Sequence, residues 1–337
     1  MIAMVQTERK HWVDVAKGIL ILLVVWGHLD WLALTYVGTS IFSYKSYTNF
    51  AFLPYYMPAF FILSGMCSNF DTSIRSFVVR NFKSLIIPGI LLGVFVSRWF
   101  RLFCEEGLRW DNFVMMNDWQ LIYKGGSWFL TALFLSKCIY YAIHHSQVKV
   151  LYKVLFSFLM MIVGIVLYNR QYVNIWHYQH ALIALPFVQF GTYLRTKSLI
   201  DKSWTVFCVG IISLIFTYFY DYPFLNAGPH ITLQSCILFL VLSISGSLLI
   251  FVISMKISEC KLLEYLGRHT LTVYLLHGCI MIPLIKVSTM AINCNFGGRF
   301  MMVNILTGII VVCSATLICV VIDEFINRQM AFLKGRF

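Results

Sequence analysis

Long apolar stretches separated by short polar segments recur along the whole chain. A helix needs about 20 residues to cross the hydrocarbon core of a bilayer. The predicted spans are residues 15–37, 48–69, 84–103, 126–144, 150–169, 177–195, 204–222, 231–255, 266–286 and 300–323. The ends of the sixth and seventh spans are blurred. The pattern therefore predicts an all-α polytopic membrane protein, a bundle of about ten transmembrane helices that forms a single domain over residues 1–337.

Composition supports this class and the charge distribution adds an orientation. The chain is 60% hydrophobic and 12% charged, with a mean hydropathy of +0.79, whereas a soluble domain carries far more charge. With the N-terminus in the cytoplasm, most of the 26 lysines and arginines fall on the cytoplasmic side. Both termini are therefore predicted to be cytoplasmic, in a multi-pass protein of a bacterial inner or plasma membrane. The net charge of +12 fits contact with anionic lipids and gives no reason to expect nucleic acid.

The first predicted span carries two ionisable residues, Lys17 at its mouth and His28 near its middle. A titratable side chain at membrane depth costs several kcal/mol unless it is paired or hydrated, so it marks a functional site by default. The two residues lie about 16 Å apart along one helix, which suggests a substrate path along it. Asp30 follows His28 by two residues and points about 200° away, so it is not expected to orient the ring.

Other polar residues in or beside the spans each have a structural and a functional reading. His277 lies within the ninth span, where it can be a hydrogen-bonding group between helices or a part of the chemistry. Trp128 opens the fourth span, where an interfacial aromatic belt is the ordinary role. His177 and His180 have a spacing compatible with a metal, but no carboxylate accompanies them and a metal is not expected. These two histidines, together with His230, are candidates for lining a substrate pocket.

The cysteines and the longest loop add little to the functional interpretation. The 10 cysteines are scattered without a C-x-x-C pair, which favours reduced thiols that pack as small apolar groups. Cys104 and Cys294 both fall near the predicted outer face, so a disulfide between them stays open. The loop over residues 104–125 alternates aromatic and polar residues, as an interfacial belt or a cover over a cavity would.

A set of local motifs occurs in a fixed order along the chain. They are Lys17-Gly18 with His28, Tyr56-Met57-Pro58 with Phe60-Phe61 and Ser64-Gly65, Arg80 and Lys83 ahead of Pro88, Gly126-Ser127-Trp128-Phe129-Leu130, and Leu266-Gly267-Arg268-His269 with Tyr274 and His277. Together they resemble the acyltransferase-3 superfamily of integral membrane acyltransferases, and the chain is most similar to its fucose 4-O-acetylase-like and related glycan O-acetyltransferases. Many members carry arginine where this chain has Lys17, which keeps the charge but loses the bidentate fork.

The resemblance implies an activity and roles for particular residues. The expected reaction is O-acyl transfer from cytoplasmic acyl-CoA, with acetyl-CoA as co-substrate, to a hydroxyl of a glycan or a lipid-linked sugar. Lys17, Arg80 and Lys83 would hold the phosphates of the donor. His28 would act as general base or as an acyl relay, with His277 as a second catalytic candidate. The acceptor would be bound by Trp128, His177 and His180.

Other classes of function stay open on the sequence alone. A transporter or flippase for a polar or lipid-linked sugar would also need polar groups inside the membrane. Such proteins usually show repeated halves with broken helices, and no counterpart of the Lys17-Gly18 opening occurs near residues 170–200. A sensor or scaffold would have no need for the basic residue and histidine of the first span. N-acylation of an amino sugar would use the same machinery. An enzyme is the favoured interpretation.

Overall fold

The computed structural model of the chain describes residues 11–38, 50–96, 127–170, 175–196, 203–219, 233–296 and 301–335, and all regular secondary structure in these ranges is helical. Several residues considered above lie outside the described part of the chain. These are the loop over 104–125, Cys104 and His230, together with the side chain of Cys294. The possible disulfide therefore stays a prediction.

The N-terminal part of the described chain folds into three helical segments. The first is α1 (His11–Leu32), which continues as the π-helical turn η1 (Ala33–Val37). The second is α2 (Phe50–Cys67). The third is a continuous run made of α3 (Ile74–Asn81), η3 (Phe82–Ile86), α4 (Ile87–Ile90) and η4 (Leu91–Val96).

The C-terminal part contains the longest helices. They are α8 (Trp128–His145), α9 (Val150–Asn169), the short η6 (Ile175–His177), α10 (Tyr178–Thr196), α11 (Ser203–Phe219), α12 (Leu233–Lys256), α13 (Lys261–Arg268), α14 (Thr270–Phe296), α15 (Met301–Gln329) and the closing turn η8 (Ala331–Lys334).

Six helical segments of the described chain are long and apolar enough to cross a membrane. They are His11–Val37, Ile74–Val96, Val150–Asn169, Ile237–Lys256, Thr270–Ile292 and Met302–Gln329. Tyr55–Cys67 and Trp204–Ser213 are shorter apolar helices. These segments make the chain a multi-pass membrane protein. The count of about ten spans and the cytoplasmic position of the termini stay predictions.

The predicted span over 266–286 does not begin where the sequence pattern placed it. The helix breaks at His269, so residues 261–268 form a separate helix, α13. The buried side of α13 carries Glu264 and Gly267, while Leu262 is 68% exposed. Its exposed residues are Lys261, Leu262, Tyr265 and Arg268, and such a mixture of apolar and cationic side chains is typical of a short helix that lies at a membrane interface. Similarly, the predicted span over 84–103 begins inside a helical run that starts at Ile74.

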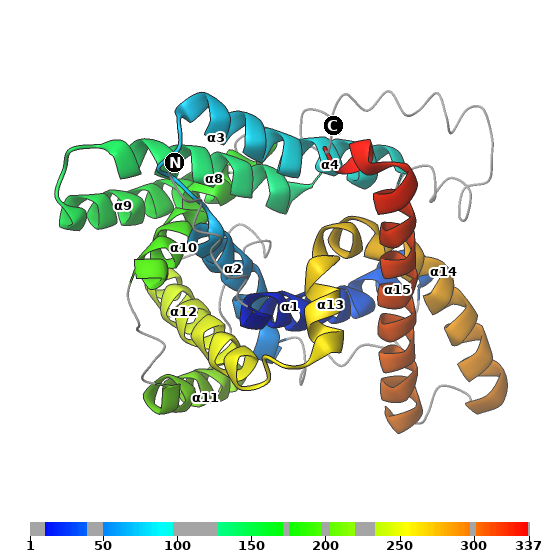
Figure 1. Cartoon of the computed structure of the whole chain (residues 1–337). Coiled ribbons are helices and arrows are strands. Elements are labelled where there is room, and N and C mark those ends of the chain that lie inside the picture. The colour runs from blue at the N-terminus through cyan, green and yellow to red at the C-terminus, as the bar shows by residue number, and fades with distance from the viewer. Residues whose placement is uncertain are drawn as a thin grey trace.

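Helix α1 runs through the middle of the bundle (Figure 1), where α2 and α12 pack on it along with α14, α15 and α13. Helix α10 lies beyond α2 and contacts α8 and α9. At the C-terminus, α15 leads into η8, which returns to the run formed by α4 and η4. The arrangement brings the C-terminal turn against the end of the third helical segment.

Glycines allow two close helix crossings. A Cβ atom on Gly18 of α1 would lie 2.1 Å from the carbonyl oxygen of Leu263, and one on Gly267 of α13 would lie 1.8 Å from that of Asp14. No real Cβ atom fits at these distances, so α1 and α13 touch backbone to backbone. In the same way, Gly65 of α2 and Gly191 of α10 face each other's backbones. The glycines beside Lys17 and Arg268 are therefore packing residues.

Candidate functional site

His28 and His277 come together from opposite parts of the sequence. The two imidazole rings, on α1 and α14, have centroids 4.9 Å apart and meet edge to face at 69°. His28 is partly exposed, whereas His277 is buried. The structure thus places two titratable rings against each other within the bundle.

The same hydrogen bond holds both rings to their own helices. The Nδ1–H of His28 donates to the carbonyl oxygen of Val24 at 2.8 Å, and the Nδ1–H of His277 donates to that of Tyr274 at 2.9 Å. A carbonyl oxygen only accepts, so each neutral ring carries its hydrogen on Nδ1. The Nε2 atoms are therefore the basic nitrogens. This is the form that a general base requires.

Aromatic residues surround the pair. The ring of Trp31 meets that of His28 edge to face, with centroids 6.4 Å apart. On the α2 side, the hydroxyl of Tyr56 lies 3.2 Å from the position that a Cβ atom on Gly27 would take. A side chain at position 27 would therefore push the Tyr56 hydroxyl away from α1 by a few tenths of an ångström. The family-like motifs of the first two helices thus meet at His28.

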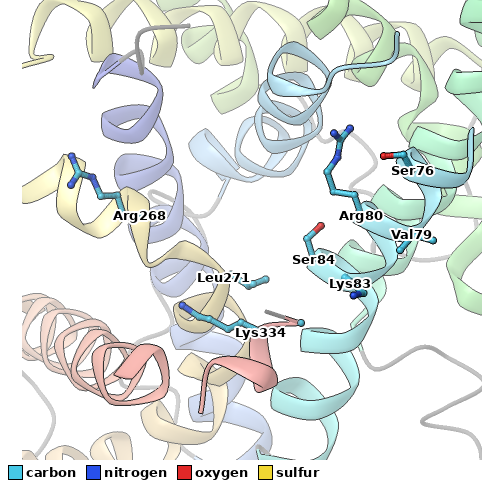
Figure 2. Close-up of a pocket in the computed structure, with 9 residues that line it drawn as sticks. Ser76, Val79, Arg80, Lys83, Ser84, Arg268, Leu271 and Lys334 are labelled. Carbon is cyan, nitrogen blue, oxygen red and sulfur yellow. The ribbon is translucent and has the colours of Figure 1, made fainter. Parts of the chain in front are cut away.

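A cavity of about 510 Å³ has a strongly cationic lining (Figure 2). Arg80 and Lys83 come from the helical run that starts with α3, Arg268 from α13 and Lys334 from η8. The described residues that line the cavity include four cations and no carboxylate. Such a concentration of positive charge suits an anionic ligand with several phosphates.

A buried carboxylate fixes the C-terminal side of this cavity. Asp323 of α15, which is fully buried, accepts a bond from the ammonium of Lys334 at 2.6 Å and from Nδ1–H of His269 at 2.5 Å. The hydroxyl of Thr272 also donates to it. Gly335 packs directly on the carbonyl oxygen of Lys83. The last turn of the chain is therefore tied to the break between α13 and α14.

Ion pairs also order the cations near α1. The carboxylate of Asp14, which is buried, lies 3.3 Å from the ammonium of Lys17 and 4.0 Å from the guanidinium of Arg268. Arg268 also pairs with Glu264. Burial raises the pKa of Glu264, but hydrogen bonds from Arg268 and His11 outweigh it and lower the pKa overall. Arg80 donates to the carbonyl oxygen of Asn69 at 3.2 Å.

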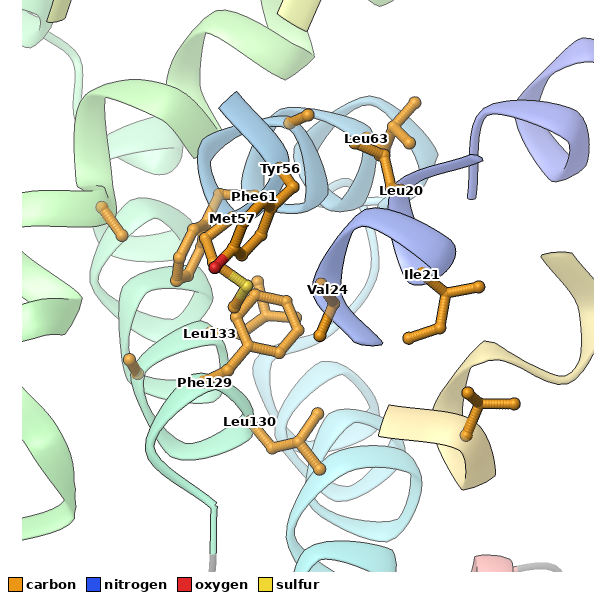
Figure 3. Close-up of a cluster of buried hydrophobic side chains, with 14 of the residues drawn as sticks. Leu20, Ile21, Val24, Tyr56, Met57, Phe61, Leu63, Phe129, Leu130 and Leu133 are labelled. Carbon is orange, nitrogen blue, oxygen red and sulfur yellow. The ribbon is translucent and has the colours of Figure 1, made fainter. Parts of the chain in front are cut away.

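A second cavity, of about 230 Å³, adjoins the first. Leu271 lines both. Lys17 and Tyr274 contribute polar groups to a lining that is otherwise mostly apolar, with Phe129 and Leu130 of α8 on one side. Figure 3 shows these α8 side chains facing α1 and α2 within the buried apolar cluster. The sequence grouped Lys17 with Arg80 and Lys83, but Lys17 lines this second cavity and the other two line the first.

Tyr274 connects the second cavity with the histidine pair. Its side chain lines the cavity, and its ring centroid lies 6.3 Å from that of His277. The hydroxyl of Ser127 donates to the Tyr274 oxygen at 3.1 Å. The Tyr274 hydroxyl therefore keeps its own hydrogen available for another acceptor. A row of contacts runs from the cationic cavity through Leu271 and Tyr274 to the two histidines.

The residues predicted to bind the acceptor form a cluster of their own. The ring of His180 lies 5.3 Å from that of Trp128 and 5.5 Å from that of His177. Tyr168 closes the cluster at 5.2 Å from His180. His177 has a φ of 53°, in the left-handed turn that leads into α10. None of these residues lines either of the two cavities described above, and their predicted role stays a prediction.

Arg268, Lys334 and Tyr274 were not among the residues predicted for the site. Arg268 and Tyr274 belong to the motif that ends in His277, so their place in that motif could have indicated that they belong to the site. Lys334 lies near the C-terminus and outside all the motifs. Only the return of η8 to α4 brings it to the cavity.

Comparison with protein families finds a match that covers most of the chain. The sequence profile of the acyltransferase-3 family, described as an acyltransferase domain, matches residues 10–324. This range includes both histidines, both cavities except for the contribution of η8, and the α13–α14 break. Comparison with curated proteins and with solved structures finds no match.

Proposed function

Because the chain belongs to the acyltransferase-3 family, we propose that it transfers an acetyl or other acyl group from cytoplasmic acyl-CoA to a hydroxyl of a cell-surface glycan or glycolipid precursor. The observation that carries this proposal is the continuity of the site. A cationic cavity, a mostly apolar cavity and a pair of histidines follow one another through shared or touching residues.

The two cavities suit the two halves of acyl-CoA. The nucleotide end of the donor carries phosphates, which the cations Arg80, Lys83, Arg268 and Lys334 would neutralise. The uncharged pantetheine arm would lie in the mostly apolar second cavity. Lys17 lines that cavity while paired with Asp14, so its charge would act on the arm or the nearest phosphate. The thioester would then reach Tyr274 and the histidines.

The histidines supply the acid–base chemistry of the transfer. Nε2 of His28 takes the proton of the acceptor hydroxyl while the hydroxyl oxygen attacks the thioester carbonyl carbon. The carbonyl π electrons move to oxygen, and the Tyr274 hydroxyl donates to the oxyanion. When the intermediate collapses, the carbon–sulfur bond breaks and the thiolate takes the proton from the His28 imidazolium. The products are an acyl ester and free CoA. His277 supports His28 through their ring contact.

A sugar hydroxyl is the proposed acceptor. The cluster of Trp128, His177 and His180 offers an aromatic face and ring nitrogens of the kind that bind sugars. Trp128 is adjacent in sequence to Phe129, which lines the second, mostly apolar cavity. An acceptor held at the cluster would therefore lie close to the wall of the second cavity.

Radiolabelled acetyl-CoA supplied to inside-out membrane vesicles tests the proposal. Vesicles from cells that express the chain should incorporate label into a lipid-linked or polymeric glycan. Alkaline hydroxylamine should release that label, as expected for an ester. His28→Ala should abolish incorporation at an equal amount of protein in the membrane. Label that resists hydroxylamine would replace O-acylation with N-acylation. Movement of a lipid-linked sugar without acylation by any acyl-CoA would contradict the enzyme and favour a transporter.

A further inference from the structure

A third cavity, of about 490 Å³, lies away from the histidine pair and the donor cavities. Helix α10 contributes its floor, and α9 and α12 contribute its walls, with Val154 and Leu240 as examples. Residues at the end of α8 and in the turn after α2, His144 and Phe70, close one end. None of its lining residues belongs to the site described above.

Two cations lie at that closed end. The ammonium of Lys153 donates to the carbonyl oxygen of His144 at 2.7 Å, and the guanidinium of Arg195 donates to that of Ser68 at 2.7 Å. Among the described residues, neither cation forms an ion pair with a carboxylate. Asp71 is the nearby acid, and it accepts a hydrogen bond from Nε2–H of His144 at 3.0 Å. The closed end of the cavity therefore carries a net positive charge.

The remaining walls are mostly apolar and extend beyond this cavity. Leu240 and Ile244 of α12 also line a fourth cavity, of about 350 Å³, which lies between α11 and α12 and has an almost wholly apolar lining. The helices that form the walls face the bilayer, since Leu155 of α9 and Val241 of α12 are each 54% exposed. Hydrocarbon chains can thus lie along α12 across both cavities.

We propose that the third cavity binds one anionic membrane phospholipid, with its phosphate between Lys153 and Arg195 and its acyl chains along Leu240 and Ile244. Two cations at one end of a long apolar groove complement a phosphodiester with two hydrocarbon chains. A free phosphate would leave the apolar walls unused. Lipid binding can be measured without acyl transfer, so failure of this proposal and failure of the proposed function can be told apart.

The lipid site and the donor site share a structural element. Arg195 holds the carbonyl of Ser68, and Arg80 of the donor cavity holds the carbonyl of the next residue, Asn69. Phe70, which follows directly, lines the lipid cavity. A bound lipid therefore stabilises the turn on which Arg80 rests, and removal of the lipid should weaken donor binding without changing the chemistry.

Native mass spectrometry of the full-length protein in mixed micelles tests the site. The probes are phosphatidylglycerol and phosphatidylcholine, which differ in net charge. We expect one phosphatidylglycerol to bind with higher affinity than phosphatidylcholine. Lys153→Gln should weaken phosphatidylglycerol binding about tenfold, because it removes one charged partner of the phosphate. Val154→Trp should weaken both lipids, because the indole fills the space for the chains.

Lys149→Gln is the matched control, since Lys149 is exposed, precedes Lys153 by one helical turn and does not line the cavity. It should leave lipid binding unchanged. Equal binding of both lipids, or equal effects of Lys149→Gln and Lys153→Gln, would overturn the proposal. Displacement of phosphatidylglycerol by a polyprenyl phosphate at much lower concentration would overturn it as well, and would assign the cavity to a lipid-linked acceptor.

Discussion

The imidazole rings of His28 and His277 lie 4.9 Å apart, and each is held by its Nδ1–H on a carbonyl of its own helix. The two residues come from α1 and α14, so the pair is created by the tertiary fold. No local sequence motif contains both residues. The bonds to the carbonyl oxygens hold the hydrogen of each ring on Nδ1 and leave the two Nε2 atoms as basic nitrogens on neighbouring rings. The proposed acid–base chemistry depends on this arrangement.

Removal of the His28 ring should stop transfer and leave the protein folded. We expect His28→Ala to lower the rate of acyl transfer by about 10²–10⁴-fold, because the general base is lost, with donor affinity unchanged. The measurement is the initial rate of label transfer from acetyl-CoA by purified protein. His145→Ala is the matched control, since His145 also donates Nδ1–H to a carbonyl four residues earlier, that of Tyr141 at 3.0 Å. Equal rates for the two variants would refute the role of His28.

Removal of the Tyr274 hydroxyl should affect the chemical step more than donor binding. Tyr274→Phe keeps the ring and its contact with His277 but removes a donor to the oxyanion. Loss of one such donor lowers kcat by about 10²–10³-fold in known acyl-transfer sites. Steady-state kinetics should therefore show a lower kcat with KM for the donor almost unchanged. A large rise in KM with normal kcat would instead mean that Tyr274 only binds the donor.

The crossing of α1 and α13 should not tolerate a side chain at position 267. Gly267→Ala places a methyl group 1.8 Å from the carbonyl oxygen of Asp14, so the helices must separate. Overpacking of this kind costs about 1–3 kcal/mol, and the melting temperature of the purified protein should fall. Gly278→Ala is the control, because no atom lies within 4 Å of the added methyl group. Similar melting temperatures for both variants would contradict the close crossing.

The buried carboxylate of Asp323 should be required for both stability and donor affinity. Asp323→Asn removes the charge that Lys334 and His269 share, and breaking a buried ion pair costs about 3–5 kcal/mol. Without this ion pair η8 is no longer tied to α15. Lys334 should then leave the cationic cavity, and acyl-CoA binding should weaken. Glu324→Gln, at the neighbouring and more exposed position, should cost less than about 1 kcal/mol. Thermal unfolding measured with and without acetyl-CoA separates the two effects, and normal donor affinity in Asp323→Asn would exclude η8 from the site.

The parts of the site that lie on one helix were predictable from the sequence. Lys17 and His28 stand out because ionisable residues are costly within an apolar span. The role of Gly18 as a packing residue was not visible, because its partner is α13, more than two hundred residues away in the chain. The pairing of His28 with His277 was hidden for the same reason.

The boundaries within 261–296 were predicted less well. The predicted span over 266–286 took in the last three residues of α13, so it missed the break at His269. The break is stabilised by Asp323, a residue on another helix, through His269 and Thr272. Lys334 reaches the cationic cavity only through this same network. Contacts between distant segments, and not local propensity, determine this part of the site.

The measurement that tests the account most directly is the thermal stabilisation of the purified protein by acetyl-CoA. At a hundred times its dissociation constant the donor should stabilise the fold by about 2.7 kcal/mol. His28→Ala should show the full shift, and Arg80→Gln combined with Lys83→Gln should show almost none. Arg75→Gln, an exposed arginine on the same helix that does not line the cavity, should behave as the wild type. An equal shift in all variants, or no shift with any acyl-CoA, would contradict a donor site in the cationic cavity.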